Sequence, residues 1–317
     1  MVVGRLAPSP TGAQHLGNAR TFLIAWLSIR SQNGHLILRI EDIDSPRVKH
    51  WAIQQAIEDL SWLGLHWDEG PGPTAQSQRY IQSQRLDLYL TALEKLKKAE
   101  AIYPCTCSRS DVANAASAPH ELSDAPVYGR TCFHRHSKDA LKLQEDYSWR
   151  YRSTQEPVHF VDGFKGSLQA NIATELGDFV VFKSDRSPSY QLSVVVDDNA
   201  MGINEVLRGE DLVQSTFRQI ALYDFFGWKP PHFIHAPLVV GPDGRRLAKR
   251  HGDTRISYFR EKGVKPERII GLLAHSLGWL DQPREVSAAD LITGFSLGTI
   301  PDRPFVCGNA ELEWLLK

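Results

Sequence analysis

The stretch RLAPSPTGAQHLGNAR, residues 5–20, places prolines, glycines and a His-Leu-Gly-Asn step directly before a helical pattern. Gly12 and Gly17 let a ligand approach the backbone where a Cβ atom would block it. The helix that follows offers free amide groups and the positive end of its dipole, which suit a phosphate. His15 and Asn18 add side-chain donors without a fixed negative charge. The stretch predicts a nucleotide site, although a tight strand-to-helix turn with an exposed histidine has a similar composition.

A second stretch, GRRLAKRHGD at residues 244–253, is a loop flanked by glycines that carries Arg245, Arg246, Lys249 and Arg250. A solvated basic loop has the same appearance. The alternative is a mobile loop whose lysine closes over phosphates, because placed cations stabilise the charge that develops on a transferring phosphate.

Three of the four cysteines, Cys105, Cys107 and Cys132, lie near one another in the sequence. In a chain expected to be cytoplasmic, such a cluster favours a metal site over disulfides. Zinc prefers four ligands in a tetrahedron, mainly thiolate and imidazole. From this chemistry the fourth ligand would be His134 or His136, although three unrelated thiols would leave the same pattern.

The composition is that of an ordinary globular protein, since 42% of the 317 residues are apolar and 23% are charged. A net charge of −1 gives no overall attraction to nucleic acid, so any RNA contact must come from local basic patches. No apolar run reaches the roughly 20 residues of a membrane span, and the N-terminus lacks the pattern of a secretory signal. We expect a cytoplasmic monomer without membrane contact, in which Cys307 is a small buried hydrophobe.

Strand and helix patterns alternate along the first 100 residues, which is typical of a parallel sheet covered by helices. The expected elements are a strand at 2–8, a helix at Leu16–Ser31, a strand at His35–Asp42 and helices at Val48–Leu65 and 78–100. Trp26, Trp51 and Trp62 lie within the helical patterns, so we expect them in the core.

Between Tyr103 and Leu176, cysteines, histidines, glycines and prolines interrupt this pattern, which predicts an insertion with short strands at 148–153 and 158–163. The α/β pattern then returns with a helix at about 215–226 and a strand at Phe233–Val240. The expected domains are a catalytic domain at 1–102 and 177–255, the insertion at 103–176 and a helical tail at 256–317.

Five blocks of the sequence resemble the class I aminoacyl-tRNA synthetases, in the form of the glutamyl and glutaminyl enzymes. APSPTG…HLGN resembles their HIGH element and RLAKR their KMSKS loop. The other three blocks are LRIEDIDSPR (38–47), PSYQLSVVVDD (188–198) and VLRGEDLVQST (206–216). The resemblance covers residues 2–255. It implies an α/β fold with a Rossmann-like parallel sheet, a zinc-bearing insertion and a short helical tail, without an anticodon-binding domain.

The resemblance also implies the roles of individual residues. Arg5 would pair with a carboxylate of L-glutamate and Glu41 would hold its α-ammonium group. The full set of glutamate contacts would be Arg5, Ala7, Ser9, Glu41, Tyr190 and Arg208. ATP, with magnesium, would be bound by His15, Gly17, Asn18 and Lys249, of which His15, Asn18 and Lys249 would serve catalysis. The zinc ligands would be Cys105, Cys107, Tyr128 and Cys132, so a tyrosine takes the place of a histidine.

Two features depart from the full-length glutamyl enzymes. Only about 60 residues follow the KMSKS-like loop, and Ala248 replaces the usual serine in it, so we expect slower or weaker ATP activation. The short form with its Cys-x-Cys cluster resembles the truncated branch of the family. That branch activates glutamate without tRNA and esterifies it onto the queuosine base in the anticodon of tRNA(Asp).

Two alternatives are a truncated synthetase that charges tRNA(Glu) at its acceptor end and an inactive homologue that binds RNA. The retained glutamate and ATP residues favour an active enzyme. Contacts with RNA phosphates are expected from Arg47, Lys49, Arg245 and Arg250.

Overall fold

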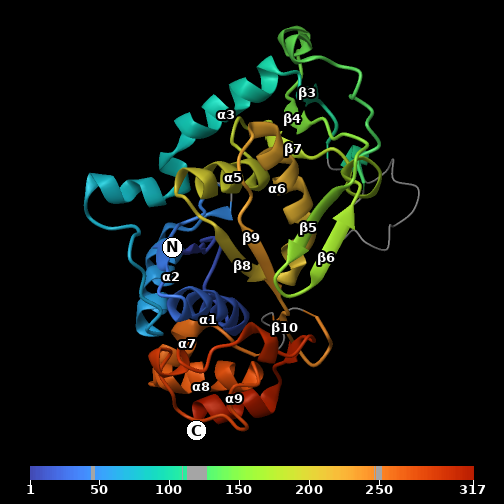
Figure 1. The fold of residues 1–317 in the computed structure, drawn as a ribbon. Helices are drawn as coiled ribbons and strands as arrows, with labels where there is room; N and C mark the ends of the chain where they lie inside the picture. Colours follow the sequence, from blue (N-terminus) through green and yellow to red (C-terminus); the bar gives the residue numbers. More distant parts are fainter. Residues whose placement is uncertain (44–46, 109, 113–126, 246, 248–251) are drawn as a thin grey trace. The chain divides into compact units, whose positions relative to one another are not determined.

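The computed structural model describes residues 1–43, 47–108, 110–112, 127–245, 247 and 252–317 (Figure 1). These residues divide into two compact units. The first unit contains residues 1–81, 203–211 and 232–317, and the second contains 82–202 and 212–231. The predicted domain boundaries, at residues 102, 176 and 255, stay a prediction.

Parallel strands form the centre of the first unit. They are β1 (Val3–Leu6), β2 (His35–Leu38), β8 (Glu205–Gly209) and β9 (His232–Ala236). β1 pairs with β2 and β8 pairs with β9, both in parallel. The backbone N–H of Asn204 donates to the carbonyl of Val3 at 3.0 Å, so β1 also lies beside β8. The parallel pairing predicted from the alternating pattern is confirmed.

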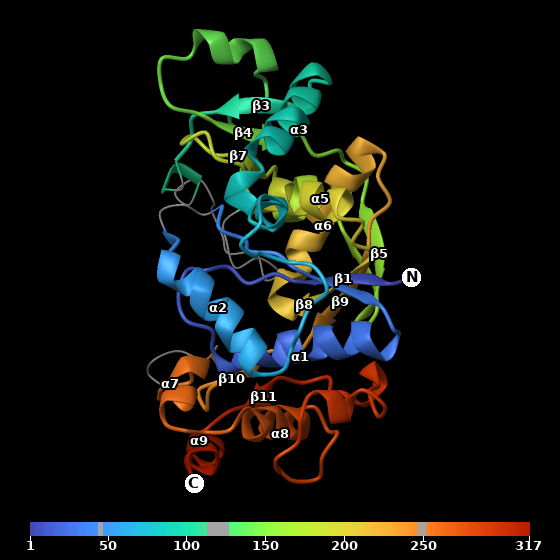
Figure 2. The ribbon, with the colours of Figure 1, turned by 90° about the vertical axis from the view of Figure 1, so that its left-hand side faces the viewer.

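Helix α1 (Leu16–Ser31) packs against β1, β2 and β8 (Figure 2), and its bounds are those predicted from the apolar spacing. The approach of β1 to this helix is close. A Cβ atom at Gly4 would lie 2.4 Å from Cδ1 of Ile29, so the strand needs a glycine at this point.

The remaining elements of the first unit are α2 (His50–Trp62), β10 (Val239–Val240), α7 (Ile256–Glu261), α8 (Pro266–Ser276), β11 (Phe305–Val306) and α9 (Asn309–Leu316). The predicted helical tail is largely confirmed, but the tail also contributes β11, which pairs in parallel with β10. Arg20 of α1 connects the sheet layer to this tail. Its Nε donates to Oγ of Ser276 at 3.0 Å and its Nη1 donates to the carbonyl of Pro237 at 2.5 Å.

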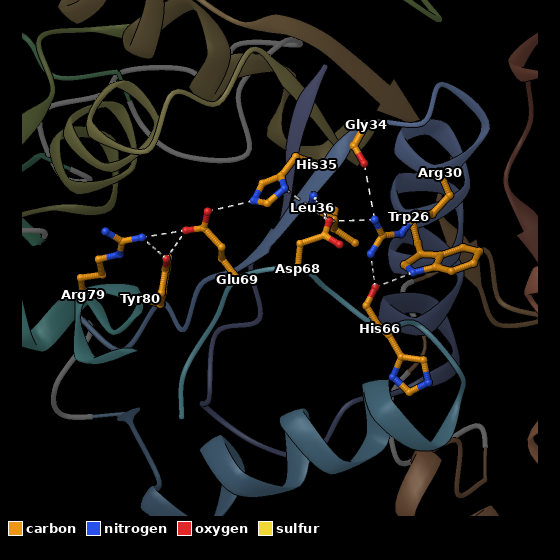
Figure 3. Close-up of polar contacts among 10 residues, drawn as sticks. All are labelled: Trp26, Arg30, Gly34, His35, Leu36, His66, Asp68, Glu69, Arg79 and Tyr80. Carbon is orange, nitrogen blue, oxygen red and sulfur yellow. Dashed lines mark hydrogen bonds and ion pairs between the residues drawn. The ribbon is translucent and has the colours of Figure 1, made fainter. Parts of the chain in front are cut away.

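A polar network joins the end of α1 to β2 and to the segment that follows α2 (Figure 3). Nη1 of Arg30 lies 2.7 Å from Oδ2 of Asp68, and the same oxygen accepts the backbone N–H of Leu36 at 2.8 Å. Glu69 accepts a hydrogen bond from Tyr80, which lowers the pKa of the Glu69 carboxyl. The network fixes the beginning of β2 through groups that lie outside the sheet.

The described residues of the second unit form antiparallel strands and helices that pack with them (Figure 1). The strands are β3 (Ile102–Cys105), β4 (Ser148–Tyr151) and β7 (Val180–Phe182), in the order β3-β4-β7, and the hairpin β5 (Val158–Asp162) with β6 (Gly166–Ala170). The helices are α3 (Leu86–Lys98), α5 (Tyr190–Ala200) and α6 (Val213–Phe226). The predicted strands at 148–153 and 158–163 and the predicted helix at 215–226 are confirmed.

The predicted helix over 78–100 is wrong in its first part. Short 3₁₀ turns occupy 75–80 and 82–84, and the α-helix begins only at Leu86. Ile81 is extended, with φ −116° and ψ 119°, and forms a bridge with Ile40. The backbone N–H of Ile40 donates to the carbonyl of Tyr80 at 2.8 Å. This pairing with the strand side of the first unit overrides the local helical pattern.

The expected burial of the tryptophans is confirmed only for Trp26, which is buried. Trp62 is half-buried and Trp51 is 52% exposed, so the prediction of a core role for Trp51 is wrong. Ala52 and Ala56 lie on the buried face of α2, and Trp51 lies outside that face. No helix among the described residues is both long and apolar enough to cross a bilayer.

Asp59 of α2 is expected to make stability depend on pH. Burial raises the pKa of this carboxyl to about 6, although Arg260 lies 3.4 Å away and opposes the shift. Because the folded state holds the proton more tightly than the unfolded state, ionisation of Asp59 costs stability as the pH rises from about 4 to about 6. Asp59→Asn should therefore gain stability relative to wild type over this interval, by about 2 kcal/mol, and the gain should level off above it. Urea unfolding at several pH values measures it, and a difference that does not change with pH would contradict the assignment.

Candidate active site and metal centre

The N-terminus of α1 gathers three of the residues predicted to bind ATP. His15 directly precedes the helix in an extended conformation, and its backbone N–H donates to Oδ1 of Asn18 at 3.3 Å. Gly17 lies in the first turn, where a Cβ atom would make only ordinary contact, and no atom lies within 4 Å of one at Gly12. Packing within the protein therefore does not require either glycine, which agrees with the predicted approach of a ligand. The first turn has no acidic residue, as a site for phosphate requires.

Thr254, which sequence reasoning missed, ties this helix start to the end of the basic loop. Its Oγ1 lies 2.9 Å from Nδ1 of His15, and its carbonyl accepts the backbone N–H of Leu16 at 3.0 Å. A further hydrogen bond between the same segments runs from the backbone N–H of Ile256 to the carbonyl of Gln14 at 2.9 Å. The bond between Nδ1 and a buried hydroxyl restricts the orientation of the His15 ring.

The carboxyl ends of the parallel strands carry residues predicted to bind glutamate. Arg5 lies in β1 and is buried, and its Nη1 donates to the carbonyl of Leu207 in β8 at 3.1 Å. Ala7 and Ser9 follow the end of β1. The backbone N–H of Glu41 donates to the carbonyl of Pro8 at 3.0 Å, which holds the segment after β2 beside the segment after β1. Ligands of open α/β sheets bind at such strand ends.

Two of these residues have buried polar partners that the sequence analysis did not identify. Nη2 of Arg39 lies 3.0 Å from Oε1 of Glu41, and both side chains are buried. The signal was present, because residues two apart in an extended segment project to the same side. Arg208 in β8 is also buried, and its Nε donates to Nε2 of His235 in β9 at 3.0 Å. These partners hold the charged groups in fixed positions at the strand ends.

Two further predicted contacts are not among these residues of the first unit. Tyr190 is the first residue of α5 in the second unit, and its role toward glutamate stays a prediction. Lys249 lies outside the described residues, as do Arg246, Ala248 and Arg250 of the same loop.

A compact cluster of sulfur atoms lies in the second unit, at the end of β3. The sulfur atoms of Cys105, Cys107 and Cys132 all lie within 4.8 Å of one another. The hydroxyl of Tyr128 lies 3.3 Å from Sγ of Cys105 and 3.9 Å from Sγ of Cys107, and it accepts the backbone N–H of Cys132 at 2.9 Å. Three sulfurs and one phenol oxygen thus converge on one buried point.

The two histidines considered as a fourth ligand are placed differently. His134 and His136 are both exposed, and Nδ1 of His136 lies 3.5 Å from Oε2 of Glu100. Neither histidine belongs to the group of clustered donors found among the described residues. The geometry therefore favours Tyr128 over either histidine as the fourth donor.

The chemistry of the donors fits a zinc ion. Burial raises the pKa of Cys107 to about 11, so a metal ion must displace its proton on binding. Arg150 of β4 lies against the cluster, with its Nε donating to Sγ of Cys105 at 3.2 Å and its guanidinium 3.9 Å from the centre of the Tyr128 ring. A cation in this position offsets the negative charge of several thiolates around one metal ion. The three cysteines can hold a metal such as zinc.

Comparison with known proteins identifies the family. Residues 1–314 match the family model described as tRNA synthetases class I (E and Q), catalytic domain. The chain belongs to this family. It is 51% identical over 287 residues to the glutamyl-Q tRNA(Asp) synthetase of Rhodopirellula baltica, which covers 87% of this chain and 85% of that protein. The glutamyl-Q tRNA(Asp) synthetase of Symbiobacterium thermophilum is 46% identical over 308 residues, across 96% of this chain and 95% of that protein.

A solved structure supports the same family. The crystal structure of a glutamate tRNA ligase from Elizabethkingia meningosepticum, in complex with its amino acid, matches with a TM-score of 0.81 and 30% identity. The match covers 99% of this chain and 68% of that one. The predicted α/β class I synthetase fold is confirmed, and so is the resemblance to the glutamyl and glutaminyl enzymes.

We predict that the purified protein holds one zinc ion and that Tyr128 is its fourth ligand. Cys107→Ala should lose the metal. Tyr128→Phe keeps the aromatic ring and should hold zinc more weakly by at least about tenfold, a loss already typical of removing a partner outside the coordination sphere. Metal analysis and competition with a chelating dye measure both effects. His134→Ala is the matched control, and a loss of affinity in this control but not in Tyr128→Phe would reverse the assignment.

We predict that Thr254 is a positioning residue for His15. Thr254→Val keeps the shape of the side chain and removes the hydroxyl, so the His15 ring loses this hydrogen bond. The turnover number for glutamate-dependent exchange of pyrophosphate into ATP should fall about tenfold, the effect of one lost hydrogen bond, with the KM for glutamate unchanged. Thr254→Ser should retain most of the activity. Equal losses in both variants would show that the methyl group matters rather than the hydroxyl.

Proposed function

We propose that this chain is a glutamyl-Q tRNA(Asp) synthetase. It would activate L-glutamate with ATP, without tRNA, and transfer the glutamyl group to the queuosine base in the anticodon of tRNA(Asp). The observation that carries this proposal is the similarity to two glutamyl-Q tRNA(Asp) synthetases over at least 85% of the length of each relative. The sulfur cluster with Tyr128 adds support, because the truncated branch of the family has this donor set. Such an enzyme would act in the cytoplasm.

The proposed glutamate site uses opposite charges at the strand ends. The guanidinium of Arg5 would pair with one carboxylate of glutamate, and Ala7, Ser9, Tyr190 and Arg208 would complete the contacts. Glu41 would accept the α-ammonium group. The buried ion pair of Glu41 with Arg39 supports this role, because it holds the Glu41 carboxylate in one place for a cationic ligand.

The first step would form glutamyl adenylate. An oxygen of the glutamate α-carboxylate attacks the α-phosphorus of ATP, the bond to the bridging oxygen breaks, and pyrophosphate leaves. His15, Gly17 and Asn18 would hold ATP at the start of α1, and Lys249 would stabilise charge on the phosphates. Magnesium, bound mainly through phosphate oxygens and water, would offset that charge further. Catalysis of this kind depends mostly on positioning and on electrostatic stabilisation.

In the second step a hydroxyl of the queuosine base would attack the carbonyl carbon of the adenylate. An ester bond forms, the proton of the hydroxyl is lost, and AMP leaves. The zinc ion would not take part in either step. It would stabilise the part of the chain between β3 and β4, where the cysteines provide the connection that a hydrophobic core provides elsewhere.

A second candidate is a glutamate–tRNA ligase that charges tRNA(Glu) at its acceptor end. The match to the solved glutamate tRNA ligase favours it, although this chain covers only 68% of that one. The two functions differ in which RNA is labelled and at which position.

The deciding experiment supplies labelled glutamate and ATP with tRNA(Asp) that carries or lacks queuosine, and with tRNA(Glu). We expect label only on tRNA(Asp) with queuosine, and label that also appears on this tRNA when its 3′-terminal adenosine has been removed before the reaction. Glutamate-dependent pyrophosphate exchange should proceed without any tRNA. Labelling of tRNA(Glu) at its acceptor end would establish the second candidate instead.

A further inference from the structure

Trp51 is a large aromatic side chain that the fold leaves outside its core. It lies in the first turn of α2 and is 52% exposed, whereas Ala52, Ala56 and Leu60 of the same helix are buried. The second half of α2 is covered by α7, where Arg260 reaches Asp59 at 3.4 Å. Trp51 precedes that contact by two turns. This exposure follows from the position of Trp51 outside the buried face of α2, and it leaves a large aromatic ring available to a partner.

The surroundings of Trp51 are cationic. Nζ of Lys49 lies 5.7 Å from the centre of the indole ring, and Arg47 and His50 are also exposed. The first turn of α2 contains no acidic residue, and this end of the helix carries the positive end of its dipole. The exposed start of α2 thus has two cations of its own, Lys49 and Arg47, in a chain whose net charge is −1.

This surface is joined to the proposed glutamate site by the backbone. The N–H of Lys49 donates to the carbonyl of Pro10 at 2.9 Å, and the N–H of Glu41 donates to the carbonyl of Pro8 at 3.0 Å. Ser9 lies between these two prolines. An RNA held at Trp51 would therefore lie beside the segment predicted to hold glutamate.

We propose that Trp51 stacks on an unpaired base of the substrate tRNA, while Lys49 and Arg47 contact neighbouring phosphates. Single-stranded RNA is recognised by aromatic side chains that stack on exposed bases, together with cations along the backbone. A double-stranded stem offers no such base, so the occupant is a loop. The inference rests on the proposed function and deepens it, because an anticodon loop supplies unpaired bases next to the nucleotide that is to be modified.

The test compares Trp51→Ala with Trp51→Phe and with Leu316→Ala, an exposed apolar side chain of the same unit that serves as the control. We expect Trp51→Ala to weaken binding of queuosine-containing tRNA(Asp) by about 5- to 100-fold, the range for one base stacked on an aromatic side chain. Trp51→Phe should bind within about threefold of wild type, since its ring still stacks. Leu316→Ala should bind as wild type does, and pyrophosphate exchange without tRNA should be the same in all of these proteins.

Salt dependence separates stacking from charge. Lys49→Ala should reduce the slope of log affinity against log salt by about one, whereas Trp51→Ala should leave that slope unchanged. Wild-type affinity in Trp51→Ala would overturn the role of Trp51, and so would a dimer in the wild type that this substitution dissociates. Failure of the wild type to form glutamyl adenylate would instead overturn the proposed function.

Discussion

The hydrogen bond between His15 and Thr254 joins two parts of the chain that are 239 positions apart. The first part begins the helix that is predicted to receive ATP, and the second ends the loop that carries Lys249. The hydrogen bond therefore places the start of α1 beside the end of the basic loop. The positive end of α1 has a fixed direction, because β1 and β2 pack against the helix. The loop is anchored at its far end by the same residue that orients the histidine.

The carboxyl ends of the parallel strands carry residues predicted to bind glutamate, and strand pairing brings these residues together. Arg5, Glu41 and Arg208 come from three separate parts of the sequence, and the parallel pairing of their strands places them at one edge. Each group is also held by a buried partner, so it has little freedom to reorient. A site for an amino acid with two carboxylates and one ammonium group needs this rigidity, because charges of both signs must be matched at once.

The sequence predicted well those features that depend on local pattern. Helix α1 has the predicted bounds because its apolar spacing and its glycine-rich start agree, and the cysteine cluster forms because its members already lie close in the chain. Features that depend on distant partners were missed. Ile81 lies in a stretch with a helical pattern but is extended, because it pairs with Ile40. The short strand β11 forms because it pairs with β10. The contacts of Thr254 and His235 join distant segments, and the spacing of residues along the sequence does not predict such pairs. The exposure of Trp51 contradicts its helical pattern, and such conflicts are common where a residue serves binding.

The guanidinium of Arg20 has one more consequence, for the relation between the tail and the rest of the first unit. It is 1% exposed, and burial lowers its pKa only to about 10, so it stays charged at neutral pH inside the protein. Ser276 of α8 and the carbonyl of Pro237 supply the oxygen atoms that replace water around it. Ser276 of the tail thus provides part of the polar shell of a cation that belongs to α1, and a chain cut after Arg255 would leave that charge with the carbonyl of Pro237 but without the two oxygens of Ser276.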